Sequence, residues 1–138
     1  MPFEPSFFTR APATPRLVLS LRRLAREIDH AWPDRATSSD GWIGDASHAS
    51  RVSDHNPDRN GLVHALDVTA AGVNTPVLIN RVTRHPATEY VIHDGMIWSR
   101  RFDMKPREYE GPDPHTSHVH VSVRHTRTAE RNRTTWLR

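Results

Sequence analysis

The chain has 138 residues, of which 36% are hydrophobic and 25% charged, enough for one compact domain with one core. It has no cysteine, which excludes disulfide scaffolds, thiolate metal clusters and cysteine nucleophiles, so any bound metal needs nitrogen and oxygen ligands. The net charge is only +3 and the arginines are spread along the chain, so we expect a solvated basic surface and no nucleic-acid partner.

The N-terminal part is predicted to hold an arm, a helix and a long loop. Residues 1–13 place phenylalanines between prolines without a sustained period, which predicts an arm. The helix is expected to begin with Thr14 as its cap and Pro15 in its first turn, and to end near Trp32. Its core face is predicted to comprise Leu17, Leu21, Leu24, Ile28 and Ala31. Residues 34–60, rich in small polar residues, glycine and proline, predict a loop.

The middle of the chain alternates strand and helix patterns. Residues 63–68 (VHALDV) predict a short buried strand, and Asn74-Thr75-Pro76 predicts the start of a helix that runs to about Arg84. In YVIH-DG-MIWS, Asp94-Gly95 suits a two-residue turn between two apolar runs, which predicts a hairpin.

The last predicted strand is HVHVSV at 118–123, which alternates strictly, and residues 124–138 form a basic tail. We therefore predict a single α+β domain over residues 1–138. Its architecture is expected to be a small antiparallel sheet with helices packed on one face and a metal site on the other.

The histidines indicate where that site lies. Two stretches far apart in the chain hold most of the ten, namely His48, His55 and His64 in one, and His115, His118, His120 and His125 in the other. Such separated segments suggest a single site assembled by folding.

Strand alternation places His118 and His120 on the face opposite the core valines, and a neighbouring strand would bring Asp67 beside His120. A carboxylate flanked by apolar residues is costly to bury unless it has a partner, which a metal would supply. We assign His55, Asp67 and His120 as ligands of a catalytic Zn²⁺, with His118 close enough to act as the base and His115 assisting. His64 is expected to point to the other face.

Together these residues resemble a known family. The pattern is Ser53-x-His55, then Gly61, Ala65-x-Asp67, and finally His115-x-x-His118-x-His120. It is similar to that of the zinc peptidases of peptidoglycan, which include D-alanyl-D-alanine carboxypeptidases, the dipeptidases of vancomycin resistance and L-alanyl-D-glutamate endopeptidases. The resemblance is nearest to phage endolysins that attack actinobacterial walls, and it extends over the central and C-terminal parts of the chain.

The resemblance implies the same zinc ligands by position. It also implies that His118, which stands where other members carry a catalytic Glu, is a base or transition-state stabiliser, and that His115 takes part in catalysis. The family uses an arginine to bind substrate or polarise the scissile carbonyl, for which Arg51 and Arg100 are the candidates, with Ser53 as a further substrate-binding candidate. One departure is a loop after His55 that is five residues longer than is usual in the family.

The expected function is zinc-dependent hydrolysis of peptidoglycan stem peptides or cross-links by zinc-activated water, with the bond left open between D-Ala, L-Ala–D-Glu and cross-bridge linkages. We expect a monomeric catalytic domain without membrane insertion, since no apolar run reaches the roughly 18 residues that a membrane helix needs. The N-terminus does not have a signal peptide's basic and then apolar pattern. We therefore expect synthesis in the bacterial cytoplasm and holin-dependent release to the wall.

Two alternatives come from other classes. Asp54-His55-x-Pro57 resembles the start of an HNH-type metal-dependent nuclease motif, but such motifs continue with an Asn and a His on a following helix. The other is a non-catalytic, basic wall-binding module with a structural metal, for which four protein ligands would be typical.

Overall fold

The computed structural model describes residues 14–44 and 53–138, so the predicted arm at 1–13 lies outside the described residues. The elements in chain order are β1 (Arg16–Leu17), α1 (Leu19–Ala31), β2 (Leu62–Val63), β3 (Ala65–Thr69), α3 (Thr75–Arg84), β4 (Thr88–His93), β5 (Met96–Ser99), the 3₁₀ turn η2 (Arg100–Phe102), β6 (Pro106–Glu108), β7 (His118–Val123) and α4 (Arg127–Glu130). The fold is α+β, as the sequence predicts.

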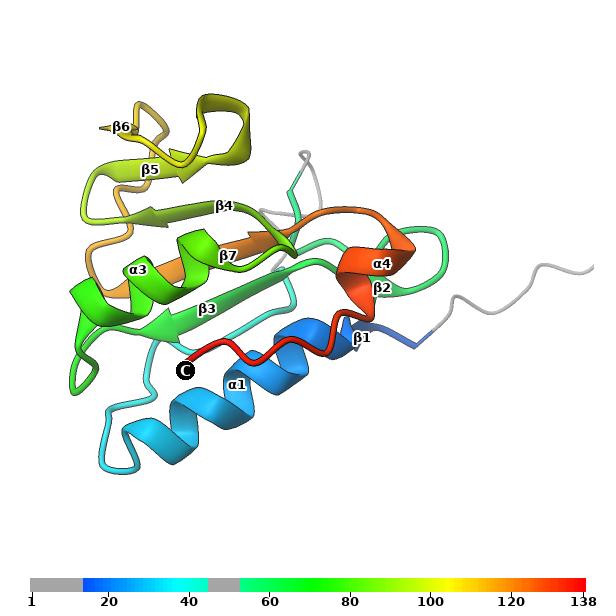
Figure 1. The fold of residues 1–138 in the computed structure, drawn as a ribbon, viewed down its shortest axis with the longest axis horizontal. Coiled ribbons are helices and arrows are strands. Elements are labelled where there is room, and N and C mark those ends of the chain that lie inside the picture. Colours follow the sequence, from blue (N-terminus) through cyan, green and yellow to red (C-terminus); the bar gives the residue numbers. More distant parts are fainter. Residues whose placement is uncertain (1–13, 45–52) are drawn as a thin grey trace, which may run out of the picture.

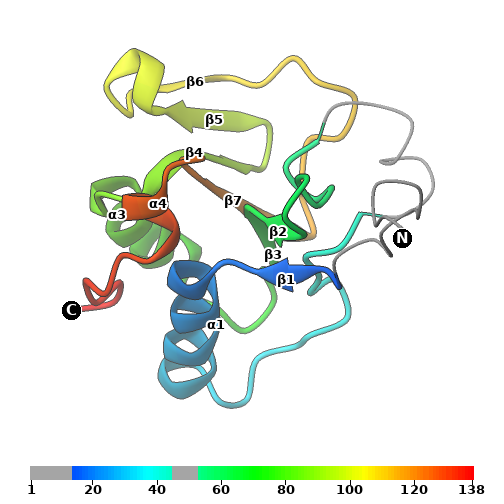
Figure 2. The same cartoon turned by 90° about the vertical axis from the view of Figure 1, so that its right-hand side faces the viewer.

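A five-stranded antiparallel sheet forms the centre of the fold, with the strand order β3-β7-β4-β5-β6 (Figure 1). The helices lie on one side of this sheet, and the segments before β2 and before β7 lie on the other (Figure 2). This arrangement confirms the predicted layers.

The alternating sequence of β7 explains why the sheet has one apolar and one polar face. Val119, Val121 and Val123 are fully buried and belong to the same core cluster as Leu24 of α1 and Leu78 of α3. Because successive side chains of a strand point to opposite faces, the side chain of His120 lies on the face away from the helices. That face carries the candidate site.

The first helix begins later than predicted. Residues 16–17 form a short parallel pairing with 62–63, and α1 starts only at Leu19, with Val18 as an N-cap that makes no side-chain capping bond. The predicted capping role of Thr14 and the helical position of Pro15 are therefore wrong, because tertiary pairing keeps this stretch extended. Of the predicted core face, Leu21, Leu24 and Ile28 are buried in α1, whereas Leu17 is buried in β1 and Ala31 is exposed.

The other predicted turns and caps are found where the sequence places them. The side chain of Asn74 accepts a hydrogen bond from the Val77 amide at the start of α3, and His85 ends that helix. Asp94 and Gly95 both adopt positive φ, 48° and 77°, in the tight turn between β4 and β5. This conformation matches the two-residue hairpin turn that Asp-Gly favours.

The C-terminal segment completes the core. Trp136 is 2% exposed, its indole N–H donates to the Ser20 carbonyl, and its ring stacks on His85 at 3.5 Å. Glu27 accepts hydrogen bonds from the backbone amides of Trp136 and Leu137, each at 3.0 Å. Residues 124–138 thus carry a core residue as well as the exposed arginines expected of a basic tail.

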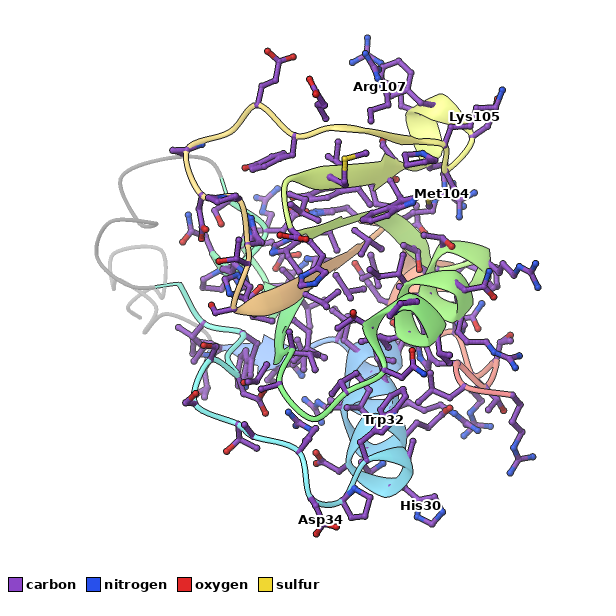
Figure 3. The ribbon with its side chains drawn as sticks, turned by 90° about the vertical axis from the view of Figure 1, so that its left-hand side faces the viewer. His30, Trp32, Asp34, Met104, Lys105 and Arg107 are labelled. Atoms are coloured by element: carbon purple, nitrogen blue, oxygen red, sulfur yellow. The ribbon has the colours of Figure 1, made fainter. Side chains whose placement is uncertain are left out.

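Charged and polar side chains project outward at both ends of the molecule. Figure 3 labels His30 and Asp34 at the end of α1 and Lys105 and Arg107 near β6, and all four residues are exposed. His30 belongs to neither of the two histidine-bearing stretches of the chain. None of the described helices is both long and apolar enough to cross a membrane.

Candidate metal centre

Three side chains far apart in sequence converge on the polar face of the sheet. Asp67 of β3 and His120 of β7 are direct partners in the strand register, as predicted. His55 comes from the loop before β2, and its Nε2 lies 3.2 Å from both His120 Nδ1 and Asp67 Oδ2. His120 Nδ1 lies 3.1 Å from Asp67 Oδ1. Two imidazole nitrogens and the two oxygens of one carboxylate are therefore close neighbours in this cluster.

The distances between these atoms suit a metal ion. Zinc bonds of about 2.0–2.1 Å in tetrahedral geometry place neighbouring ligand atoms roughly 3.3 Å apart. The observed separations of 3.1–3.2 Å are close to that value. The donor set of two imidazoles and one carboxylate also suits a divalent metal, so these three residues could hold one.

Hydrogen bonds on the outer side of each imidazole fix its orientation. His55 Nδ1 lies 2.9 Å from the Trp42 carbonyl, which can only accept, so Nδ1 carries a hydrogen and Nε2 is the ring nitrogen that faces the cluster. His120 Nε2 lies 2.8 Å from Ser122 Oγ, which leaves Nδ1 facing Asp67. Such outer partners are characteristic of metal-binding histidines.

Backbone pairing explains how the loops bring these partners in. Gly41 and Asp67 exchange two backbone hydrogen bonds, of 2.7 and 3.1 Å, along the outer edge of β3. The Gly44 amide donates to the His55 carbonyl at 3.0 Å, and the His64 amide donates to the Asp54 carbonyl at 3.2 Å. The backbone is therefore anchored at Asp54 and His55, and the longer loop that follows does not carry His55 away from the cluster.

Burial and mutual contacts shift the pKa values within the cluster. Burial acts to raise the pKa of Asp67, but hydrogen bonds from His120 and His55 outweigh it and hold that pKa well below its usual range. Burial lowers the pKa of His120. For His55, burial is outweighed by the Asp67 carboxylate, so its pKa is raised. The carboxylate is thus ionised at neutral pH and ready to bind a cation.

The cluster opens into a hollow of about 430 Å³. The lining includes residues that the sequence analysis did not single out, namely Tyr90, Ile92, Tyr109, Pro112 and Asp113. Tyr90 and Ile92 could have been found from strand alternation, because they face Ser122 and His120 in the register of β4 with β7. Tyr109, Pro112 and Asp113 lie on an irregular segment, for which the sequence carries no periodic signal.

The two proposed catalytic histidines lie next to the cluster. His118 Nε2 is 3.8 Å from Asp67 Oδ2, and His118 Nδ1 is 3.1 Å from Ser117 Oγ. The ring centroid of His115 lies 4.7 Å from that of His118 and 5.5 Å from that of His120. The structure therefore brings both histidines into the same hollow as the three possible ligands.

The three substrate-binding candidates are placed differently. Ser53 lines the hollow, and its Oγ accepts a hydrogen bond from the His55 amide at 3.2 Å. Arg100 is not brought to the hollow, because its guanidinium donates to the carbonyl of Thr88, the first residue of β4, and to that of Pro86. Arg51 lies outside the described residues. Within the described part of the chain, no arginine lines the hollow.

His64 lies outside the cluster, as expected from strand alternation. Its Nε2 is 2.8 Å from Glu130 Oε2, and its ring stacks on His125 at 3.8 Å. His125 in turn contacts Asp54 Oδ1 at 2.8 Å. These contacts tie α4 and the segment after β7 to the loop that carries His55.

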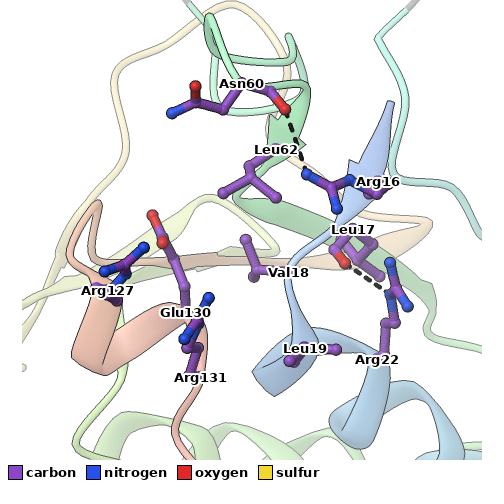
Figure 4. A pocket seen from close by; sticks show the side chains of 10 residues that line it. All are labelled: Arg16, Leu17, Val18, Leu19, Arg22, Asn60, Leu62, Arg127, Glu130 and Arg131. Atoms are coloured by element: carbon purple, nitrogen blue, oxygen red, sulfur yellow. Dashed lines mark hydrogen bonds between the residues drawn. The ribbon is translucent and has the colours of Figure 1, made fainter. Parts of the chain in front are cut away.

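A separate cavity of about 680 Å³ lies between β1, β2 and α4, and none of the three possible ligands lines it. Figure 4 shows Arg16 and Arg22 on one side of this cavity and Arg127, Glu130 and Arg131 on the other. Part of the basic surface expected from the composition therefore lies around this cavity, away from the cluster of His55, Asp67 and His120.

Comparison with known proteins adds no family to this geometry: no family model matches the sequence, and neither the curated proteins nor the solved structures give a match.

Proposed function

We propose that this protein is a zinc-dependent peptidase that hydrolyses peptide bonds of bacterial peptidoglycan. The observation that carries the proposal is the convergence of His55, Asp67 and His120 within 3.2 Å of one another, in an open hollow that also contains His118. The sequence pattern that resembles the zinc peptidases of peptidoglycan supplies the substrate class.

Each side chain has a task in this proposal. His55, Asp67 and His120 would hold the metal, which when bound supplies Lewis-acid chemistry by polarising a carbonyl and acidifying water. His118 accepts a proton at Nε2, because its Nδ1 can donate to Ser117 Oγ and so fix the required tautomer. His115, whose ring centroid lies 4.7 Å from that of His118, assists in orienting substrate.

The open hollow favours catalysis over a purely structural metal. Structural zinc sites are normally closed by four protein ligands, whereas catalytic sites have three and leave room for substrate. Here three side chains converge beside about 430 Å³ of open volume. The nuclease alternative is not favoured, because the residues that follow Asp54-His55 form turns and strands up to Thr69, where that motif needs a helix.

The experiment is peptide release from purified actinobacterial peptidoglycan, with fragments resolved by mass. We expect a chelator to stop release and added zinc to restore it, with the fragment masses naming the bond. Failure of well-folded, zinc-loaded protein to release any fragment from several wall types would rule the proposal out.

Two histidine variants separate metal binding from chemistry. His120→Ala should lose the metal, whereas His118→Ala should retain it and lose about 10²- to 10⁴-fold in rate, the usual contribution of a general base. His30→Ala, at an exposed position on α1, is the control and should behave as the wild type. A wild-type rate for His118→Ala would show that the assigned role is incorrect.

A further inference from the structure

A second group of possible metal ligands stands beside the first, on the segment that leads into β7. It consists of Asp113, His115 and His118, whose ligand atoms all lie within 4.8 Å of one another. Asp113 has no part in the function proposed above, yet it lines the same hollow. The chemistry of the group, one carboxylate and two imidazoles, matches that of the first cluster.

The backbone around this group is held in place by the neighbouring hairpin. His93 Nδ1 contacts the carbonyl oxygens of both His115 and His118, at 3.0 and 2.9 Å. The Gly95 amide, in the hairpin turn, donates to the Pro114 carbonyl at 2.8 Å. The segment therefore presents its side chains from a fixed frame, as a metal site requires.

The ligand atoms of the group are free to bind. The buried Nδ1 of His115 has no hydrogen-bond partner in the protein, and a buried polar atom in that state is uncommon. Asp113 uses Oδ1 to accept from the His115 amide at 2.9 Å, which leaves its second carboxylate oxygen. His118 directs Nε2 into the hollow, since Nδ1 contacts Ser117.

The two groups of ligands are adjacent, but they differ in burial and therefore in the metal affinity that we expect. His118 Nε2 is 3.8 Å from Asp67 Oδ2, so an ion in the second group would lie next to the first cluster. Hydrolytic sites with two adjacent metal ions are common. The first cluster has two ligands only 5% and 6% exposed, whereas Asp113 is exposed, so the second group should bind more weakly.

We propose that Asp113, His115 and His118 bind a second divalent metal ion, such as Zn²⁺, after the first site is filled. Where the protein acts as the peptidase proposed above, on which this consequence rests, the second ion inhibits it. The reason is that the Nε2 lone pair of His118 cannot both bind a metal and accept a proton. Metal concentration would then regulate the site: one ion supports hydrolysis and two suppress it.

The test counts metal ions on the full chain without any substrate. Metal-free protein is titrated with Zn²⁺ alone, and the bound ions are counted by native mass spectrometry and by calorimetry. We expect two ions at saturation, the first bound more tightly than the second. A single ion at saturation overturns the proposal.

Asp113→Asn is the decisive variant, because Asn retains an oxygen that can accept from the His115 amide and so preserves the turn. It should bind one ion, with the affinity of the first site unchanged. Asp103→Asn is the matched control, an exposed aspartate at positive φ that Asn tolerates, and it should bind two. Two ions on both Asp113→Asn and His115→Gln would place the second ion elsewhere and overturn the proposal.

An activity arm tests the regulatory consequence. Excess Zn²⁺ should lower wild-type peptide release about tenfold or more, because a general base contributes about 10²- to 10⁴-fold. Asp113→Asn should resist this inhibition. Undiminished release with both ions bound would overturn the inhibitory role. If no peptide is released at any zinc concentration, the proposed function fails, while the ion count still decides whether the second site exists.

Discussion

Ser122 contacts His120 and Tyr90, which both line the hollow, but it does not line the hollow itself. Its Oγ lies 2.8 Å from His120 Nε2, and the residue is fully buried in β7. The Tyr90 side chain also hydrogen-bonds to Ser122 and stacks on the His120 ring at 5.4 Å. The orientation of this possible ligand therefore depends on residues behind it.

We predict that Ser122→Ala weakens metal binding by about 10- to 100-fold, the usual cost of losing an outer partner of a metal-binding histidine. The affinity is measured by competition with a chromophoric chelator. Ser20→Ala is the control, because Ser20 is equally buried but its Oγ has no partner. An unchanged affinity in Ser122→Ala would mean that Ser122 does not orient His120.

His85 supplies a pH dependence remote from the metal ligands. Burial lowers its pKa in the folded state, where it packs against Trp136. The unfolded chain therefore binds the proton first as the pH falls below about 6.5, the ordinary histidine value. The stability that His85 contributes is complete above that pH and is lost as the pH drops through the lowered pKa.

We accordingly expect the free energy of unfolding, measured with urea, to fall between pH 7.5 and pH 5.5. The fall should be smaller in His85→Gln, which cannot titrate. Equal pH slopes for the two proteins would show that His85 is not protonated more readily in the unfolded chain.

One ionic network holds the segment that follows α1, around Arg35 and Asp40, in place. Arg35 has a 7% exposed side chain and pairs with Asp29 at 2.7 Å and with Asp40 at 2.6 Å. Asp40 Oδ1 also accepts from the backbone amide and the hydroxyl of Thr69, each at 2.8 Å. This network fixes the segment that carries Trp42 to the end of β3.

Asp40→Ala should therefore destabilise the protein by about 2 kcal/mol, because the charged hydrogen bonds to Arg35, whose side chain is 7% exposed, and those to Thr69 are lost together. Urea unfolding measures the change. Asp34→Ala, at an exposed position on the same segment, should stay within about 0.5 kcal/mol. Similar losses in both variants would argue against a special role for the network.

The local elements vary in how well sequence patterns predict them. The α3 helix and the hairpin were predictable, because Asn74 and Asp94-Gly95 are residues whose local geometry favours a cap and a tight turn. The start of α1 was not, because the pairing of Arg16 with Leu62 overrides the capping preference of Thr14. A pairing between residues so distant leaves no local signal.

Across the whole molecule, the C-terminal segment closes the core over α1 and α3. Trp136 inserts beside His85, and its indole N–H bonds to the carbonyl of Ser20 in α1. The chain thus uses its last residues to stabilise the helical layer that supports the sheet.

Trp136→Ala should reduce the free energy of unfolding by about 3–5 kcal/mol, since a large buried aromatic is replaced by a cavity. Thermal and urea unfolding measure the loss. Arg138→Ala, two residues further on and exposed, is the control and should unfold as the wild type does. A Trp136→Ala protein of wild-type stability would contradict the packing described for this segment.

Local order in the chain was enough to predict the α+β class, the polar face of β7 and the pairing of Asp67 with His120, because alternation and turn residues act over a few positions. Only the tertiary structure shows that His55, Tyr90 and Asp113 line one hollow and that Arg100 does not. These placements depend on loop paths and contacts between distant segments. Packing and hydrogen bonding in three dimensions determine these contacts. They leave no periodic pattern in the amino-acid sequence from which they could be predicted.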